Sequence, residues 1–198
     1  QPRAQVHCIP NMAPPVCATP YDVTARTVLA LGRLSPQKGF DRLLQAWKLV
    51  EQDVRSAGWQ LVIVGDGPQR DELTEQASQL SRASIGQAQK DVASLFAKAG
   101  LMVSSSRFEG LPMVLLEAAA LGVPIVAFDC ETGPAEIIVP DQTGLLVPQN
   151  DVAGLAEGLL CLMAAPGKRI AFSTHGKDRM ALFSRDHVLA LWRSTLGL

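Results

Sequence analysis

Six short apolar runs recur along the chain, and a glycine, proline, serine or aspartate follows each of them. Runs of this length beside turn-forming residues are typical of buried parallel strands. The third and the sixth runs are weaker than the others. We therefore predict a sheet of about six strands, at residues 27–31, 61–64, 83–85, 101–103, 125–128 and 145–147.

Between these runs the spacing of apolar residues changes to that of a helix. Phe40, Leu43, Leu44, Trp47 and Val50 recur at intervals of three and four residues, which places them on one face. Strands that alternate with helices are typical of a doubly wound, Rossmann-like α/β fold with a parallel sheet flanked by helices. Further helices are predicted at 69–80, 92–97, 113–121 and 152–163.

The two ends of the chain differ from this alternating middle. Residues 1–21 contain five prolines and no sustained periodicity, which favours an extended linker. Residues 168–198 show helical spacing and no strand, so we expect a helical tail that packs across another surface. The chain is therefore divided into a linker or lead-in segment at 1–24 and a single domain at 25–198, a size that its 198 residues fit.

Composition supports a folded, soluble chain. Hydrophobic residues make up 47% of the sequence and charged residues 19%, which argues against intrinsic disorder. The net charge of −1 gives no general attraction for nucleic acid or an anionic membrane. The longest stretch free of charged and strongly polar residues, 118–128, is interrupted by Gly122 and Pro124 and is shorter than the roughly 18 residues of a membrane-spanning helix.

The sequence lacks the motifs of several common classes of protein. The four cysteines form no CxxC pair and do not cluster with histidine, so we expect reduced thiols in a cytoplasmic protein. A Walker A loop, a GxGxxG fingerprint and the motifs of Ser-His-Asp hydrolases are absent. ATP-binding, nicotinamide and hydrolase functions therefore lose their usual support. The cysteines are Cys8, Cys17, Cys130 and Cys161.

The loop after the first predicted strand carries two cations. Arg33 and Lys38 lie between Gly32 and Gly39, at the edge of the sheet where ligands of parallel α/β proteins bind. An arginine fork and a lysine point charge suit the oxygens of a diphosphate. The alternative is that both are solvated loop cations.

A second candidate site lies between residues 104 and 117. Pro112 suits the first position of a helix, so the free N–H groups that follow it would favour an anion. Glu117 lies about one turn further on, and its carboxylate leans back toward the helix start, where it can accept hydrogen bonds from vicinal hydroxyls. The alternative is a glutamate that only favours the helix dipole. Glu109 lies on the preceding loop, facing either a ligand or solvent.

Four segments together resemble, in order and spacing, the family 4 retaining glycosyltransferases of GT-B fold. The glutamates Glu109 and Glu117 stand eight positions apart in the expected frame of glycine and proline, and the match runs from about residue 28 to 192. The resemblance implies one Rossmann-like half of a GT-B fold, the half that binds the nucleotide-sugar donor. The segments are 32–39, 64–68, 109–118 and 144–148.

The resemblance also implies roles for individual residues. Arg33 and Lys38 would neutralise the diphosphate, Glu117 would bind the ribose hydroxyls, and Glu109 would hold the transferred sugar. Arg33, Lys38 and Glu109 would thus be the catalytic residues, with no metal and no cofactor. The remaining contacts would come from the base-binding loop and the phosphate and sugar cradle, at Gly65, Gly86, Ala88, Gly110, Leu111, Pro112, Met113 and Val114.

Residues 132–138 are similar to those of family members that build bacterial surface polysaccharide, such as lipopolysaccharide, from UDP-sugars. The resemblance implies a cytoplasmic hexosyltransferase, at the inner face of the membrane, whose amino-terminal half binds the acceptor and makes any peripheral membrane contact. Nothing before residue 28 can build that half, so we expect this chain to be a donor-binding part that binds a nucleotide-sugar but transfers nothing by itself. The alternative is a stand-alone nucleotide-sugar binding or regulatory module.

Overall fold

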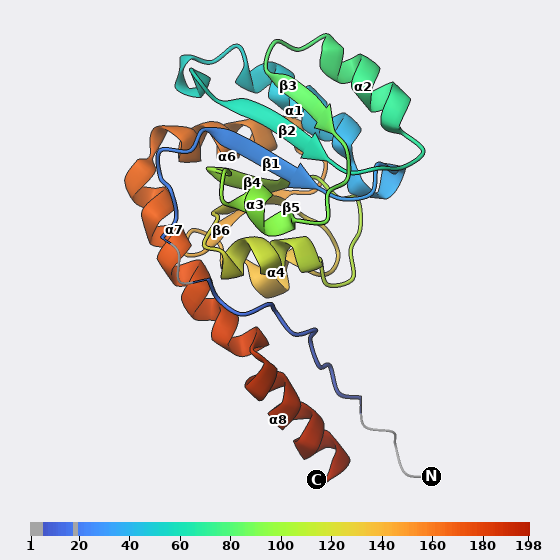
Figure 1. Ribbon diagram of the computed structural model, residues 1–198, viewed down its shortest axis with the longest axis vertical. Helices are drawn as coiled ribbons and strands as arrows, with labels where there is room; N and C mark the ends of the chain where they lie inside the picture. Colours follow the sequence, from blue (N-terminus) through green and yellow to red (C-terminus); the bar gives the residue numbers. More distant parts are fainter. Residues whose placement is uncertain (1–5, 18–19) are drawn as a thin grey trace.

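The computed structural model describes residues 6–17 and 20–198. Its centre is one sheet of six parallel strands in the order β3-β2-β1-β4-β5-β6, flanked by helices (Figure 1). The predicted doubly wound, Rossmann-like fold is confirmed. The strands are β1 (Thr27–Leu31), β2 (Gln60–Val64), β3 (Ala83–Gly86), β4 (Leu101–Ser104), β5 (Ile125–Asp129) and β6 (Gly144–Pro148).

Helices cover both faces of the sheet. One buried apolar cluster joins the sheet to α1, α2 and α6, and a second joins it to α3, α4 and α5. Short 3-10 turns occur at Pro36–Lys38 (η1), Val54–Ser56 (η2) and Met180–Phe183 (η3). The helices are α1 (Phe40–Val50), α2 (Arg70–Ser78), α3 (Val92–Phe96), α4 (Met113–Ala120), α5 (Pro134–Ile137), α6 (Val152–Ala164), α7 (Pro166–Arg179) and α8 (Arg185–Leu196).

The strand order reverses between β1 and β4. From β1 the chain builds outward to β2 and β3, then returns to the other side of β1 and builds outward through β4, β5 and β6. Val28 of β1 therefore pairs with Leu61 on one side and with Leu101 on the other. The helices that follow β1 and β4, α1 and α4, belong to different apolar clusters on opposite faces of the sheet, which leaves a crevice beyond the carboxyl ends of the strands.

The predicted elements agree with the structure apart from their ends and one addition. All six strands and all five predicted helices are present. The short helix α5 carries no apolar repeat of helical length and was not expected. Pro112 lies one position before α4, and not at its first residue, because its ψ of 101° is extended.

The carboxyl-terminal residues are helical, as predicted. They form α7, η3 and α8, and α8 projects away from the body of the molecule (Figure 1). Residues 6–17 contain no helix or strand, and they run beside this tail, where the Ala13 N–H donates to the Phe183 carbonyl at 2.8 Å. The boundary at 24/25 stays a prediction. No helix in the part of the chain that the structure describes is long and apolar enough to cross a membrane.

Candidate functional site

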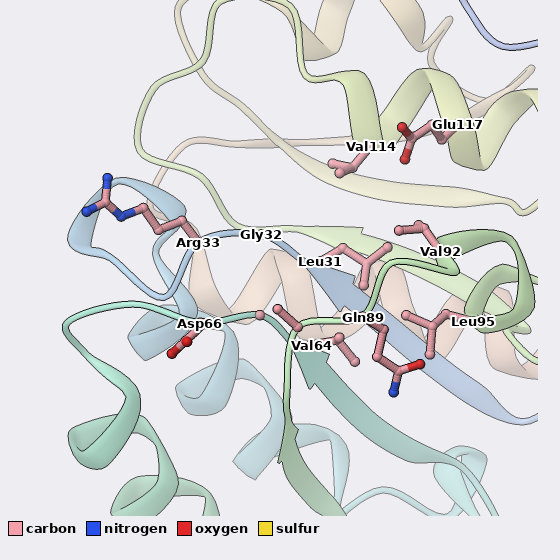
Figure 2. Close-up of a pocket in the computed structure, with 12 residues that line it drawn as sticks. Leu31, Gly32, Arg33, Val64, Asp66, Gln89, Val92, Leu95, Val114 and Glu117 are labelled. Atoms are coloured by element: carbon pink, nitrogen blue, oxygen red, sulfur yellow. The ribbon is translucent and has the colours of Figure 1, made fainter.

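A cleft of about 320 Å³ opens at the crevice between β1 and β4 (Figure 2). It lies beyond the carboxyl ends of β1 and β2, between the loop after β3 and helix α4. This is the position at which open parallel sheets bind their ligands. Its lining consists of Leu31, Gly32, Arg33, Val64, Gly65, Asp66, Ala88, Gln89, Val92, Leu95, Val114 and Glu117.

The floor and sides of this cleft are mainly apolar. Leu31 and Val64 come from the ends of neighbouring strands, Val92 and Leu95 from α3, and Val114 from α4. Polar groups stand at its edges, at Arg33, Asp66, Gln89 and Glu117. An apolar slot with few polar groups at its rim suits a flat heterocycle that carries a polar extension.

Glu117 is the acidic group that α4 presents to the cleft. It lies in the second turn of the helix, beside Val114 (Figure 2). Among residues 6–17 and 20–198, its carboxylate has no hydrogen-bond or ion-pair partner. Partial burial without a compensating cation raises the pKa of Glu117 above its ordinary value. A partly desolvated acceptor with no partner of its own is well placed to bind ligand hydroxyls.

Arg33 is the cation that the cleft contains. It is exposed, and its guanidinium extends away from Glu117 (Figure 2). Within the described residues this guanidinium makes no hydrogen bond or ion pair. All five of its N–H donors are therefore available to an anion at this end of the cleft.

Lys38 and Glu109 form an ion pair beside the cleft and are not part of its lining. The Lys38 Nζ donates to Glu109 Oε1 at 2.6 Å, and the Ser106 hydroxyl donates to the same oxygen, also at 2.6 Å. The Glu109 side chain is 7% exposed and that of Lys38 19%. In this structure Glu109 is therefore held by protein groups and is not the freely oriented loop acid that the sequence suggested.

Two glycines allow the loops of the site to approach one another. Gly39 has a φ of +64°, and a Cβ there would lie 2.1 Å from the Ser105 carbonyl oxygen. Gly133 has a φ of +95°, and its Cβ would lie 2.4 Å from the Gly110 carbonyl oxygen. Any larger residue at either position would separate the loops. A Cβ at Gly110 itself would meet nothing within 4 Å, so this backbone is open to a ligand.

The structure divides the predicted site residues into two groups. Arg33, Gly65, Ala88, Val114 and Glu117 line the cleft. The others lie outside the lining, and among them the Gly86 carbonyl is already occupied by the Gly65 N–H at 3.3 Å and by Arg70 Nη2 at 3.2 Å. This second group consists of Lys38, Gly86, Glu109, Gly110, Leu111, Pro112 and Met113.

The sequence reasoning did not assign Gln89, Val92 and Leu95 to the site. Gln89 follows the predicted base-binding residue Ala88 directly, and the three-residue spacing of Val92 and Leu95 places these two on one side of the predicted helix at 92–97. That spacing is the available signal. It does not by itself identify a site, because apolar residues on one side of a helix usually face the core.

Comparison with known proteins identifies the family of the chain. Residues 25–165 match the family model described as glycosyl transferases group 1. The chain is 38% identical over 182 residues to the amylovoran biosynthesis glycosyltransferase AmsD of Erwinia amylovora, covering 89% of the chain and 50% of AmsD. It is 31% identical over 174 residues to the lipopolysaccharide core biosynthesis glycosyltransferase LpsE of Rhizobium meliloti, covering 86% and 48%. The chain thus spans about half the length of these relatives.

Solved structures show the same fold. Anabaena Alr3699/HepE, solved in complex with UDP, superimposes with a TM-score of 0.77 at 24% identity, covering 88% of this chain and 50% of that one. The same protein has also been solved with UDP-glucose. The domain is therefore a Rossmann-like half of a GT-B fold. With its family model matched over most of its length, the chain belongs to the glycosyl transferases group 1 family.

Proposed function

We propose that this chain binds the nucleotide-sugar donor of a glycosyltransferase that makes bacterial surface polysaccharide, and that the donor is a UDP-sugar. The observation that carries the proposal is the carboxylate of Glu117, which has no partner among the described residues and lies at the edge of an apolar cleft at the reversal point of the sheet. The names of AmsD and LpsE and the UDP complexes of HepE support the substrate class.

The cleft and its surroundings accommodate the successive parts of such a donor. The apolar slot beside Ala88 and Leu95 would take the base, and Glu117 would accept hydrogen bonds from the ribose hydroxyls. The guanidinium of Arg33 and the first N–H groups of α4 would bind the diphosphate. The Lys38–Glu109 pair would then contact the diphosphate and the transferred sugar, respectively.

The proposed reaction is that of a retaining, family 4 hexosyltransferase. The bond between the anomeric carbon and the diphosphate oxygen breaks, and UDP leaves with the bonding electrons. The acceptor oxygen bonds to the same face of the sugar, and its hydroxyl proton passes to the departing diphosphate oxygen. The cations near the diphosphate stabilise this growing negative charge. The acceptor would be a saccharide or a lipid-linked saccharide held by a second, amino-terminal domain, and the complete enzyme would work at the cytoplasmic side of the membrane.

The 198-residue chain is expected to bind UDP without transferring sugar, because transfer needs donor and acceptor held together. Calorimetric titration with UDP, GDP and ADP should show preference for UDP, and assays with UDP-sugars and saccharide acceptors should show no turnover. Repeated turnover by this chain would contradict the assignment of acceptor binding to another domain. Failure to bind any nucleoside diphosphate would overturn the proposal itself.

UDP binding is expected to need no divalent metal, since the proposed diphosphate contacts are an arginine, a lysine and backbone N–H groups. In the described part of the chain, no group of three His, Cys, Asp or Glu side chains is arranged to hold a metal ion. Affinities measured in excess EDTA and in millimolar Mg²⁺ should therefore agree. A large loss of affinity in EDTA would contradict this prediction.

A further inference from the structure

The two loops that carry the proposed diphosphate and sugar contacts are bonded to each other. Lys38 lies at the end of the loop after β1, and Glu109 lies on the loop after β4. Besides the Lys38–Glu109 pair, hydrogen bonds to main-chain carbonyls join the loops: the Arg107 N–H donates to the Gln37 carbonyl at 2.7 Å, and the Ser105 hydroxyl donates to the Lys38 carbonyl at 2.9 Å. The position of one loop therefore depends on that of the other.

The side chain of Arg107 adds three hydrogen bonds to these connections. Its Nη1 and Nη2 donate to the two carboxylate oxygens of Asp41, at 2.9 and 2.7 Å, and Nη1 also donates to the Pro36 carbonyl at 2.6 Å. Asp41 lies in the first turn of α1, two residues after Gly39. A two-pronged arginine–carboxylate contact fixes both distance and orientation. Arg107 thus connects the loop after β4 to both ends of the segment that contains Lys38.

Arg107 itself does not face the cleft. It is absent from the cleft lining, and both of its terminal nitrogens already have acceptors on the protein. The hydrogen bonds from Arg107 hold the pKa of Asp41 below its ordinary value, so the carboxylate stays charged at neutral pH. An arginine two residues before Glu109 is therefore engaged by α1 and is not free to bind the donor.

We propose that Arg107, through Asp41, is a positioning residue that holds Lys38 at the correct distance from Glu109. This inference rests on the proposed function and adds to it, because no contact between Arg107 and the donor is involved. Binding groups lose much of their contribution when their support shifts by about 1 Å. The role therefore concerns the diphosphate and the sugar, while the base and ribose contacts around Ala88 and Glu117 lie on other elements.

The test compares three probes on the 198-residue chain: uridine, UDP, and the tightest-binding member of a panel of UDP-sugars. Arg107→Lys keeps the positive charge but loses the two-pronged contact with Asp41 and the hydrogen bond to the Pro36 carbonyl. Asp41→Asn removes the negative charge of the group that accepts from Arg107. Both variants are expected to bind UDP and the UDP-sugar about tenfold more weakly than wild type, with uridine affinity unchanged within about twofold. The double variant should bind UDP no more weakly than the single variant with the lower UDP affinity, because both substitutions break the same contact between Arg107 and Asp41.

Asp41→Asn separates positioning from direct binding. If Arg107 were a diphosphate ligand, this substitution would free its guanidinium and remove a nearby negative charge, so UDP would bind equally well or more tightly. Such a result would overturn the inference. So would an equal loss of affinity for all three probes, because that pattern indicates general damage to the fold.

Arg55 provides a matched control elsewhere on the surface. Its Nη2 and Nη1 contact Asp53 and Glu157, each at 2.7 Å, and its side chain is 35% exposed against 32% for Arg107. Arg55→Lys should leave the affinities for uridine, UDP and UDP-sugar unchanged. If wild type binds no nucleotide, the proposed function and this inference fall together; if wild type binds and Arg107→Lys behaves like Arg55→Lys, only the inference fails.

Discussion

Lys38→Ala is expected to weaken UDP binding and also to destabilise the fold, whereas Arg33→Ala is expected to weaken UDP binding alone. Each substitution removes charge-assisted contacts to the diphosphate, which corresponds to about a 10- to 150-fold loss of affinity. Lys38 is also the cation of the Glu109 carboxylate, whose side chain is 7% exposed. Its removal leaves that carboxylate with the Ser106 hydroxyl as its side-chain donor and should cost about 1–3 kcal/mol in the free energy of unfolding.

Urea unfolding and calorimetric titration with UDP and uridine measure the two effects separately. Lys168→Ala serves as a stability control, because its pair with Asp141 is similarly close, at 2.8 Å, but much more exposed. That control should change the free energy of unfolding by about 0–1 kcal/mol. If Lys38→Ala changed the free energy of unfolding as little as the control does, the ion pair between Lys38 and Glu109 would not persist in solution. If Arg33→Ala lost uridine and UDP affinity equally, the diphosphate assignment would be wrong.

Glu117→Gln and Glu109→Gln are expected to affect different parts of the donor. Glu117 borders the nucleotide cleft, so its substitution should weaken UDP itself, and the loss should shrink with 2′-deoxy-UDP, which lacks one of the accepted hydroxyls. Glu109 lies outside that cleft, so its substitution should leave UDP affinity nearly unchanged and weaken the intact UDP-sugar. In the complete enzyme, Glu109→Gln should lower kcat as well, if sugar contacts tighten in the transition state.

The pH dependence gives a second measure of the Glu117 role. Burial raises the pKa of Glu117, so its carboxylate takes up a proton at a higher pH than an exposed glutamate would. Ribose binding needs the ionised acceptor, and UDP affinity should therefore fall as the pH falls through this raised pKa. Glu117→Gln should lack the part of the pH dependence that comes from Glu117 and should keep the part that comes from titration of the UDP phosphates.

Equal losses of UDP affinity in Glu109→Gln and Glu117→Gln would contradict the separate roles of the two glutamates.

The local pattern along the chain was sufficient to predict the order of elements and the fold class. Strands buried on both faces appear as continuous apolar runs, and helices as runs with a repeat of three or four residues, so β1 and α1 are visible in the sequence. A chain of alternating strands and helices can adopt few topologies, because the connection from one strand through a helix to a parallel strand is right-handed. That class of fold also predicts the edge of the sheet at which Arg33 and Glu117 lie.

Pairings between distant residues could not be predicted in this way. Lys38 and Glu109 are 71 positions apart, and nothing local in the sequence shows that they are partners, or that Glu117 lacks a partner in the part of the chain that the structure describes. Arg107 and Asp41 are 66 positions apart. Spacing predicts which face of an element a residue occupies, but the partner on that face depends on which strands become neighbours and how far each loop extends.

The sequence by itself determined the alternation of strands and helices, the glycines that permit tight loops, and the residue types able to bind a diphosphate and hydroxyls. The tertiary structure alone decided which of those charged groups are engaged by the protein and which face the cleft. The physical reason is that secondary structure follows from interactions within a few residues, whereas the burial and the partners of Glu109, Glu117 and Arg33 depend on atoms contributed by distant segments.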